Sequence, residues 1–152
     1  MSLRLLAAFA LTAAALPCAA AAAQPGGVTV DSALFVEHTA FANGSAARVL
    51  APATQLTRGD RVVTLLTWVR MGGQRGGFTV TNPLPPRLAW QGSADAGEEV
   101  SVDGGRTWGR LGTLRIGARL AGAADVTHVR WHVSPDVAQG GSGTITFAGV
   151  VK

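Results

Sequence analysis

Beyond residue 23, glycine and proline divide the sequence into short runs of strand-forming residues. All 20 glycines lie in this part of the chain. Residues 28–38 alternate apolar and polar side chains, which is the period of a half-buried strand, and one face carries Val28, Val30, Leu34 and Val36. No segment of ten residues in this part has the 3.6-residue period of an amphipathic helix. The sequence therefore predicts an all-β fold.

Residues 61–70 are apolar on both faces and rich in β-formers, which predicts a central strand buried on both sides. About seven to nine short strands separated by turns predict an immunoglobulin-like β-sandwich, with a small barrel as the alternative. The run 144–151 is followed only by Lys152, so we expect it at a sheet edge that is open to strand addition by a partner. Further strands are predicted at residues 78–82, 88–91, 98–103 and 127–133.

The first 23 residues are predicted to be a secretory signal peptide that forms a short signal helix. Arg4 precedes an apolar core at residues 5–16, and small residues stand before a cleavage site after Ala23. The core is shorter than the ~20 residues of a membrane span, and Pro17 ends it. Cys18, the only cysteine, is expected to leave with the signal, because Pro17 spoils a lipoprotein site. We therefore expect a periplasmic or secreted protein, without stable membrane insertion, whose single domain spans residues 24–152.

Composition narrows the class of partner. Apolar residues make up 47% of the chain and charged residues 14%, which is typical of one folded domain. The 13 basic residues outnumber the 9 acidic ones, for a formal net charge of +4. The arginines are spread from Arg48 to Arg130 without a run of three, whereas a nucleic-acid-binding surface gathers them on one element. No nucleic-acid partner is therefore expected.

The most specific short motif is the string from Ser101 to Trp108. It resembles the Asp-box, Ser-x-Asp-x-Gly-x-Thr-Trp, which occurs on the propeller blades of sialidases and in other secreted β-proteins, away from the sialidase catalytic site. A single copy cannot build a propeller. We therefore expect a structural turn in which Asp103 accepts hydrogen bonds from backbone amides, glycines supply positive φ, and Trp108 packs back over the hairpin. The turn residues are Ser101, Asp103, Gly105, Thr107 and Trp108.

Histidines are badly spaced for a metal site. His128 and His132 share a strand face with Arg130 but lie roughly 13 Å apart along the strand. Both rings would have to approach one ion to within ~2 Å. His38 is far away in the sequence. No metal or cofactor is therefore expected.

The spacings of known catalytic motifs are not met, so the sequence predicts no reaction. Glu98 and Glu99 are adjacent, so on a strand they point to opposite faces and cannot act as a carboxylate pair. Ser142 lies between two glycines but lacks the Gly-x-Ser-x-Gly spacing of a nucleophile elbow. We expect no enzymatic activity.

The four tryptophans divide into two pairs. Trp68 and Trp131 stand in apolar strands and are predicted to be core residues. Trp90 and Trp108 are the candidate ligand contacts, since an exposed indole can stack on a sugar.

The strings Gly59–Thr64, Phe78–Pro85 and Leu88–Ser93, followed by Gly140–Ile145, resemble a conserved repeat domain of bacterial surface and envelope proteins, the domain of unknown function eleven. Two departures stand out: residues 71–73 replace an Asn-x-Gly turn, and Asn82 replaces the commoner aspartate. The chain would be a short, single-domain, exported member. The resemblance implies an immunoglobulin-like fold and an envelope setting, and it carries over no catalytic residues.

Together these features favour an exported structural or protein-interaction module of the bacterial envelope, without catalytic activity. Its partner is expected to be an envelope protein or a glycan. The alternative is a carbohydrate-binding module that uses exposed tryptophans and the Asp-box-like hairpin.

Overall fold

The alternating and apolar runs of the sequence form antiparallel strands. The computed structural model describes residues 27–42, 44–72 and 76–152, and the predicted signal peptide with its helix lies outside the described residues. Two short helical segments are present, η1 (Ala123–Asp125) and α1 (Pro135–Ala138). The ten strands of the described residues are β1 (Val28–Ala42), β2 (Ser45–Pro52), β3 (Arg61–Arg70), β4 (Phe78–Pro83), β5 (Leu88–Ser93), β6 (Glu99–Ser101), β7 (Arg115–Ile116), β8 (Arg119–Leu120), β9 (His128–Val133) and β10 (Ser142–Val151).

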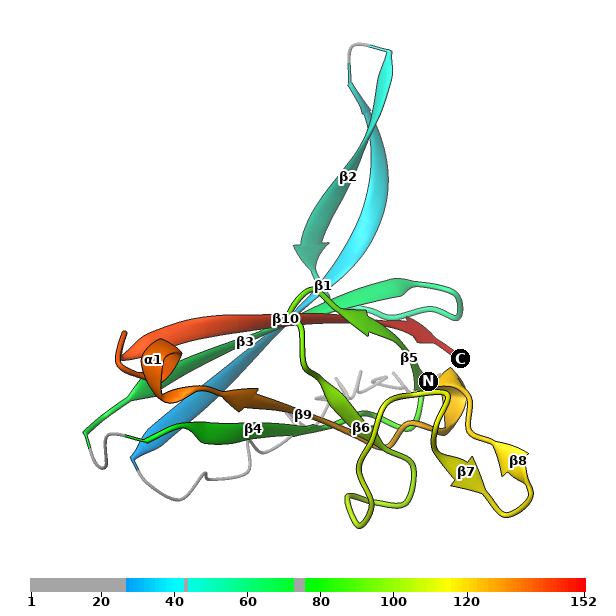
Figure 1. Cartoon of the computed structure of the whole chain (residues 1–152). Helices are drawn as coiled ribbons and strands as arrows, with labels where there is room; N and C mark the ends of the chain where they lie inside the picture. The colour runs from blue at the N-terminus through cyan, green and yellow to red at the C-terminus, as the bar shows by residue number, and fades with distance from the viewer. Residues whose placement is uncertain (1–26, 43, 73–75) are drawn as a thin grey trace, which may run out of the picture.

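Two antiparallel sheets make up the sandwich. Sheet A has the strand order β2-β1-β3-β10-β5, and sheet B has the order β4-β9-β6. Figure 1 shows sheet A lying over sheet B, which confirms the predicted all-β sandwich. The two-residue strands β7 and β8 form a separate hairpin and bring the number of strands in the described residues above the predicted range. β1, with 15 residues, is not a short strand.

Side chains from the facing sides of the two sheets fill the core. Alternation along β3 turns Val62, Leu66 and Trp68 inward. At the centre, the ring centroids of Trp131 and Phe147 lie 5.5 Å apart, and Trp90 lies 6.5 and 5.6 Å from them. Each buried aromatic side chain removes roughly 150–250 Å² from water. This ring cluster therefore supplies a large share of the hydrophobic stabilisation.

Strand β10 does not lie at an edge. It pairs with β3 along one side and with β5 along the other, so the prediction of an edge strand at residues 144–151 is wrong. The end of a chain fixes no position in a sheet, and the apolar residues of β10 reveal its interior place better. Ile145, Phe147 and Val151 are buried on the inner face, and Ala148 is only 7% exposed on the opposite one.

The prediction for residues 61–70 is correct in part. They form β3, the central strand of sheet A. Sheet B covers only the inner face of sheet A, so burial on both sides is incomplete. On the outer face Val63 is buried, whereas Leu65 and Val69 are half-buried.

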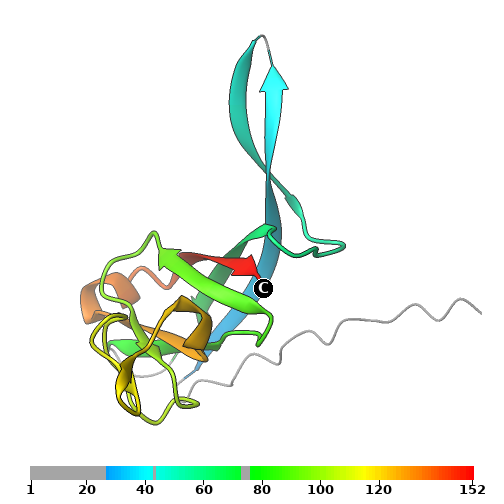
Figure 2. The same ribbon diagram turned by 90° about the vertical axis from the view of Figure 1, so that its right-hand side faces the viewer.

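One hairpin leaves the sandwich. β1 pairs with β3 only from Val28 to Val36, yet it pairs with β2 from Phe35 to Ala42. Residues 37–50, here called the arm, therefore extend beyond the body. Figure 1 shows the arm rising from the side of sheet A that faces away from sheet B, and Figure 2 shows the same arrangement after a quarter turn. At the tip of the arm Ala42 pairs with Ser45; residue 43 lies outside the described residues.

Candidate functional site

The Asp-box-like turn is organised around one carboxylate. Oδ1 of Asp103 accepts hydrogen bonds from the backbone amides of Arg106 (3.0 Å) and Thr107 (2.9 Å) and from the Ser101 hydroxyl (2.8 Å). Its Oδ2 accepts a bond from the Thr107 hydroxyl (2.6 Å). The hydroxyl and the amide of Thr107, followed by the Ser101 hydroxyl, hold the pKa of Asp103 far below its ordinary value. The amide hydrogen bonds expected of this residue are thus present.

The glycines and the tryptophan complete the turn. Gly104 and Gly105 have φ angles of +79° and +87°, a region that other residues rarely adopt. Nε1 of Trp108 donates a hydrogen bond to the Gly105 carbonyl (2.9 Å), so the indole is tied back to its own hairpin. The Trp108 ring also lies 4.4 Å from the guanidinium carbon of Arg130. The five predicted turn residues are therefore brought together, with Trp108 half-buried among them.

A polar network continues across the outer face of sheet B. Arg130 Nη2 lies 2.7 Å from Glu99 Oε2, and His132 Nε2 lies 3.2 Å from the same oxygen. The Arg130 guanidinium, and after it His132, lowers the pKa of Glu99. The second nitrogen of His132 meets the Thr79 hydroxyl at 2.9 Å. The network satisfies its own members, which suits a solvated structural face.

The three histidines occupy separate places. His128 bonds to the Thr127 hydroxyl, His132 bonds to Glu99, and His38 stands on the exposed arm. Among residues 27–42, 44–72 and 76–152, no group of three histidine, cysteine or acidic side chains could hold a metal ion.

Trp90 is not an exposed ring. It is 5% exposed, because the alternation that turns Leu88 inward along β5 also turns Trp90 inward. Trp108 instead packs on the outer face of sheet B, against Arg130 and His128. The two candidate ligand contacts therefore lie on opposite sides of sheet B and do not form one site.

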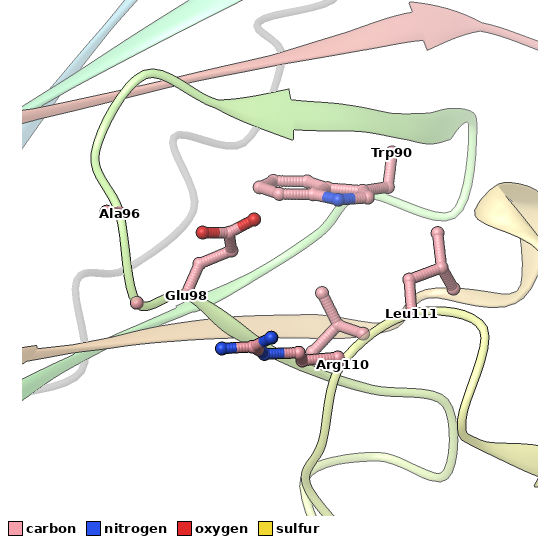
Figure 3. Close-up of a pocket in the computed structure, with 7 residues that line it drawn as sticks. Trp90, Ala96, Glu98, Arg110 and Leu111 are labelled. Atoms are coloured by element: carbon pink, nitrogen blue, oxygen red, sulfur yellow. The ribbon is translucent and has the colours of Figure 1, made fainter.

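One edge of Trp90 borders a hollow of about 370 Å³ (Figure 3). Figure 3 shows the Glu98 carboxylate beneath the indole and the Arg110 guanidinium on the same side of the hollow. Within the part of the chain that the structure describes, neither group has an ion-pair partner. Leu111 adds an apolar wall. The site therefore combines one free anion, one free cation and an aromatic edge.

This hollow was not predicted from the sequence. It forms because Val100 and Gly109 exchange backbone hydrogen bonds of 2.8 and 3.1 Å, which brings the loop after the Asp-box turn against β6. Glu99 points to the other face of sheet B, as expected for the neighbour of Glu98. No pattern in the sequence marks the site, because only the pairing of Val100 with Gly109 brings Glu98 and Arg110 together.

The glycines around Ser142 have a packing role. A Cβ on Gly143 would lie 2.6 Å from the Trp68 ring, so only glycine lets the indole pack on β10. The Gly141 carbonyl accepts a hydrogen bond from the Arg70 amide (2.8 Å). Ser142 itself is exposed and pairs with Val69.

The arm is the most exposed apolar element. Phe41 is 79% exposed, Val49 46% and Leu50 49%. Beyond Val36 each strand of the arm pairs with the other alone, which leaves two free backbone edges. Pairing runs from Phe35 to Ala42 without a register shift, so no bulge guards either edge. An isolated two-stranded hairpin is marginally stable in water.

In the described residues, no helix is long and apolar enough to cross a membrane. Comparisons with protein-family models, curated proteins and solved structures find no match to this chain. The family resemblance in the sequence remains a prediction.

Proposed function

We propose that this chain is an exported, non-catalytic protein-interaction module that contacts its partner through the arm. The observation that carries the proposal is the arm's exposure. It has apolar side chains on both faces and no third strand in the described residues. Such a hairpin needs a partner surface to become rigid.

Strand addition is the recognition mode that fits this geometry. The outer edge of β2 presents unpaired N–H and C=O groups along residues 45–52, which can pair with an extended segment. Cross-strand register puts Phe41 and Leu50 on one face of the arm, and Val49 on the other. Backbone bonds would supply affinity, and these apolar side chains would supply selectivity.

The rest of the surface supports a structural role. Within the Asp-box-like turn the polar groups bond to one another, and the same holds within the network around Glu99. The setting that we propose is the bacterial periplasm or the cell exterior, in line with the predicted signal peptide. The immunoglobulin-like description and the family of envelope repeat domains belong to the same proposal.

Co-purification from the native envelope tests this function. The tagged full-length precursor is compared with a variant in which Asn-Gly replaces residues 37–50. These two residues can close a tight turn, because Val36 and Ala51 are cross-strand partners. The variant should lose its envelope partners by roughly tenfold or more, whereas Val137→Asp on α1 should retain them. Unchanged capture by the shortened chain contradicts the proposal.

The export part has its own test. The intact mass of the exported protein should correspond to a chain that begins at Gln24. A lipidated species that begins at Cys18 would show that the predicted processing is wrong.

A second candidate function is the binding of a small polar ligand, a carbohydrate among them, in the hollow beside Trp90. The free carboxylate of Glu98 and the free guanidinium of Arg110 favour it. Envelope glycans should change the tryptophan fluorescence of the wild type. Glu98→Gln and Arg110→Gln should weaken that response, and Arg87→Gln, an exposed change elsewhere, should not. Equal responses in all variants would eliminate this site.

A further inference from the structure

We propose that the partner of the arm is a second copy of this chain. In the dimer each arm lies across the outer face of the other copy's sheet A, and Phe41 fills a hollow there. The inference rests on the proposed function of the arm and names its partner.

The receiving surface lies on sheet A at the root of the arm. Val63 on β3 and Ala148 on β10 are cross-strand partners on the outer face, with exposed fractions of 9% and 7%. Phe35 on β1 pairs with Val63 and extends this apolar centre toward the arm. No second layer of described residues covers this face, as Figure 1 shows.

A hollow of about 260 Å³ opens in this face. Its floor and walls come from Val63, Thr146 and Ala148, together with Gly92, the cross-strand partner of Ala148, and Ala94, whose amide donates a hydrogen bond to the Thr146 carbonyl (2.9 Å). The shift of register between Ala148 and Gly149 loosens the sheet here, and the small side chains leave the space unfilled. Its size exceeds that of a benzyl side chain.

Phe41 is the matching group. It is the most exposed large apolar side chain of the described residues, and its cross-strand neighbour is the small Ala46. Side chains alternate between the two faces of β1, so Phe41 lies on the same strand face as Phe35, six residues before it. The arm and the outer face of sheet A therefore form two walls of one corner, in which Glu37 forms ion pairs with Arg48 and Arg61 between the two phenylalanines.

The Phe41 side chain cannot reach the hollow of its own chain. Glu37 forms an ion pair with Arg61 at 3.2 Å, which fixes the root of the arm at the rim of the hollow. Phe41 is four residues farther along an extended strand, or roughly 13 Å away. A second copy related by a two-fold axis brings each Phe41 to the other's hollow, and the same patch serves both sides.

The contact area suits a weak dimer. Each arm is roughly 20 Å long and 10 Å wide, so two arms and two receiving faces bury on the order of 800 Å² in projection. This area lies below the roughly 1,200 Å² at which specific, stable interfaces begin, in the range of weak and transient contacts. We therefore expect dissociation constants in the micromolar range.

Sedimentation analysis of the exported chain tests the dimer from about 1 to about 300 µM. The weight-average mass of the wild type should rise from that of a monomer toward that of a dimer. Phe41→Asp on the arm and Ala94→Arg in the hollow should each weaken association by roughly tenfold or more. Val137→Asp, which changes an exposed apolar residue on α1, should associate like the wild type. A wild type that stays monomeric throughout, or a control that fails equally, overturns the proposal.

Mixing the two disruptive variants locates the contact. A heterodimer of F41D and A94R retains one intact pair, with the Phe41 of the A94R chain in the hollow of the F41D chain. The mixture should therefore associate more strongly than either variant alone. If it does not, the arms pack on each other, and Phe41 does not bind in the hollow.

A monomeric wild type that still captures an envelope protein through its arm refutes the dimer but leaves the proposed function standing. A wild type that neither dimerises nor captures an envelope protein refutes the dimer and the proposed function together.

Discussion

The two halves of strand β1 lie in regions of the molecule that differ in burial. From Val28 to Val36 it lies beside β3, and its inner face contributes Val28 and Val36 to the buried set. From residue 37 onward its only neighbour is β2, and Phe41 stands in solvent. Hydrogen bonding is continuous along the whole strand. The two halves differ in burial, so backbone pairing alone does not make a stable region.

The first prediction contrasts aromatic residues in the two regions. Trp131→Ala should lower the free energy of unfolding by about 3–5 kcal/mol, because it removes contacts to Trp90 and Phe147 and leaves a cavity. Phe41→Ala on the arm should change it by less than about 0.5 kcal/mol in the monomer. Urea unfolding at low protein concentration measures both. Similar losses would show that the arm is part of the folded core.

A smaller effect is expected where β10 meets Trp68. Gly143→Ala should destabilise the protein by about 1–3 kcal/mol, because the new methyl group would overlap the indole. Gly76→Ala is the matched control, since a Cβ there meets open space. The difference between their unfolding midpoints is the measurement. A control that destabilises as much would mean that packing on Trp68 is not the cause.

The Asp-box-like turn should make stability depend on pH. The folded pKa of Asp103 is lowered, so its stabilising contribution is complete above the unfolded value of about 3.9 and is lost as the pH falls toward the folded value. Asp103→Asn should therefore melt several degrees below the wild type near neutrality, and the gap should narrow below about pH 4. Asp31→Asn on β1 should show no such gap. A constant gap across this range would contradict the linkage.

The smallest expected effect concerns removal of the arm. Replacing residues 37–50 by Asn-Gly should leave the unfolding free energy of the monomer within about 0.5 kcal/mol of the wild type. The buried side chains of the body keep their contacts, because none of the replaced residues belongs to the core. Denaturant unfolding at low concentration checks this. A large loss would show that the arm stabilises the sandwich.

Local patterns predicted local structure well. The Asp-box-like turn could be predicted from the sequence because the hydrogen bonds of the Asp103 carboxylate join residues no more than four positions apart. The positions of most strands, and β3 as the central strand, followed from apolar runs bounded by turns. The predicted order failed at β10, because strand order depends on pairings between distant segments. Trp90 illustrates the same limit, since its burial depends on which face of β5 meets sheet B.

Neither the arm nor the hollow beside Trp90 could be predicted from sequence patterns. Residues 28–38 alternate as a half-buried strand should, but β3 ends its pairing with β1 at Val36, and the residues beyond lose their cover. Glu98 and Arg110 meet only because Val100 pairs with Gly109. In each case a long-range backbone contact decides what the side chains face.

The continuity of β1 has a mechanical consequence. A pull on the tip of the arm is transmitted along the strand into the body, where nine residue pairs join β1 to β3. The component of the load that runs along β1 is shared by these pairs in shear, so under that component they do not open one after another. The arm is therefore anchored as a tensile element.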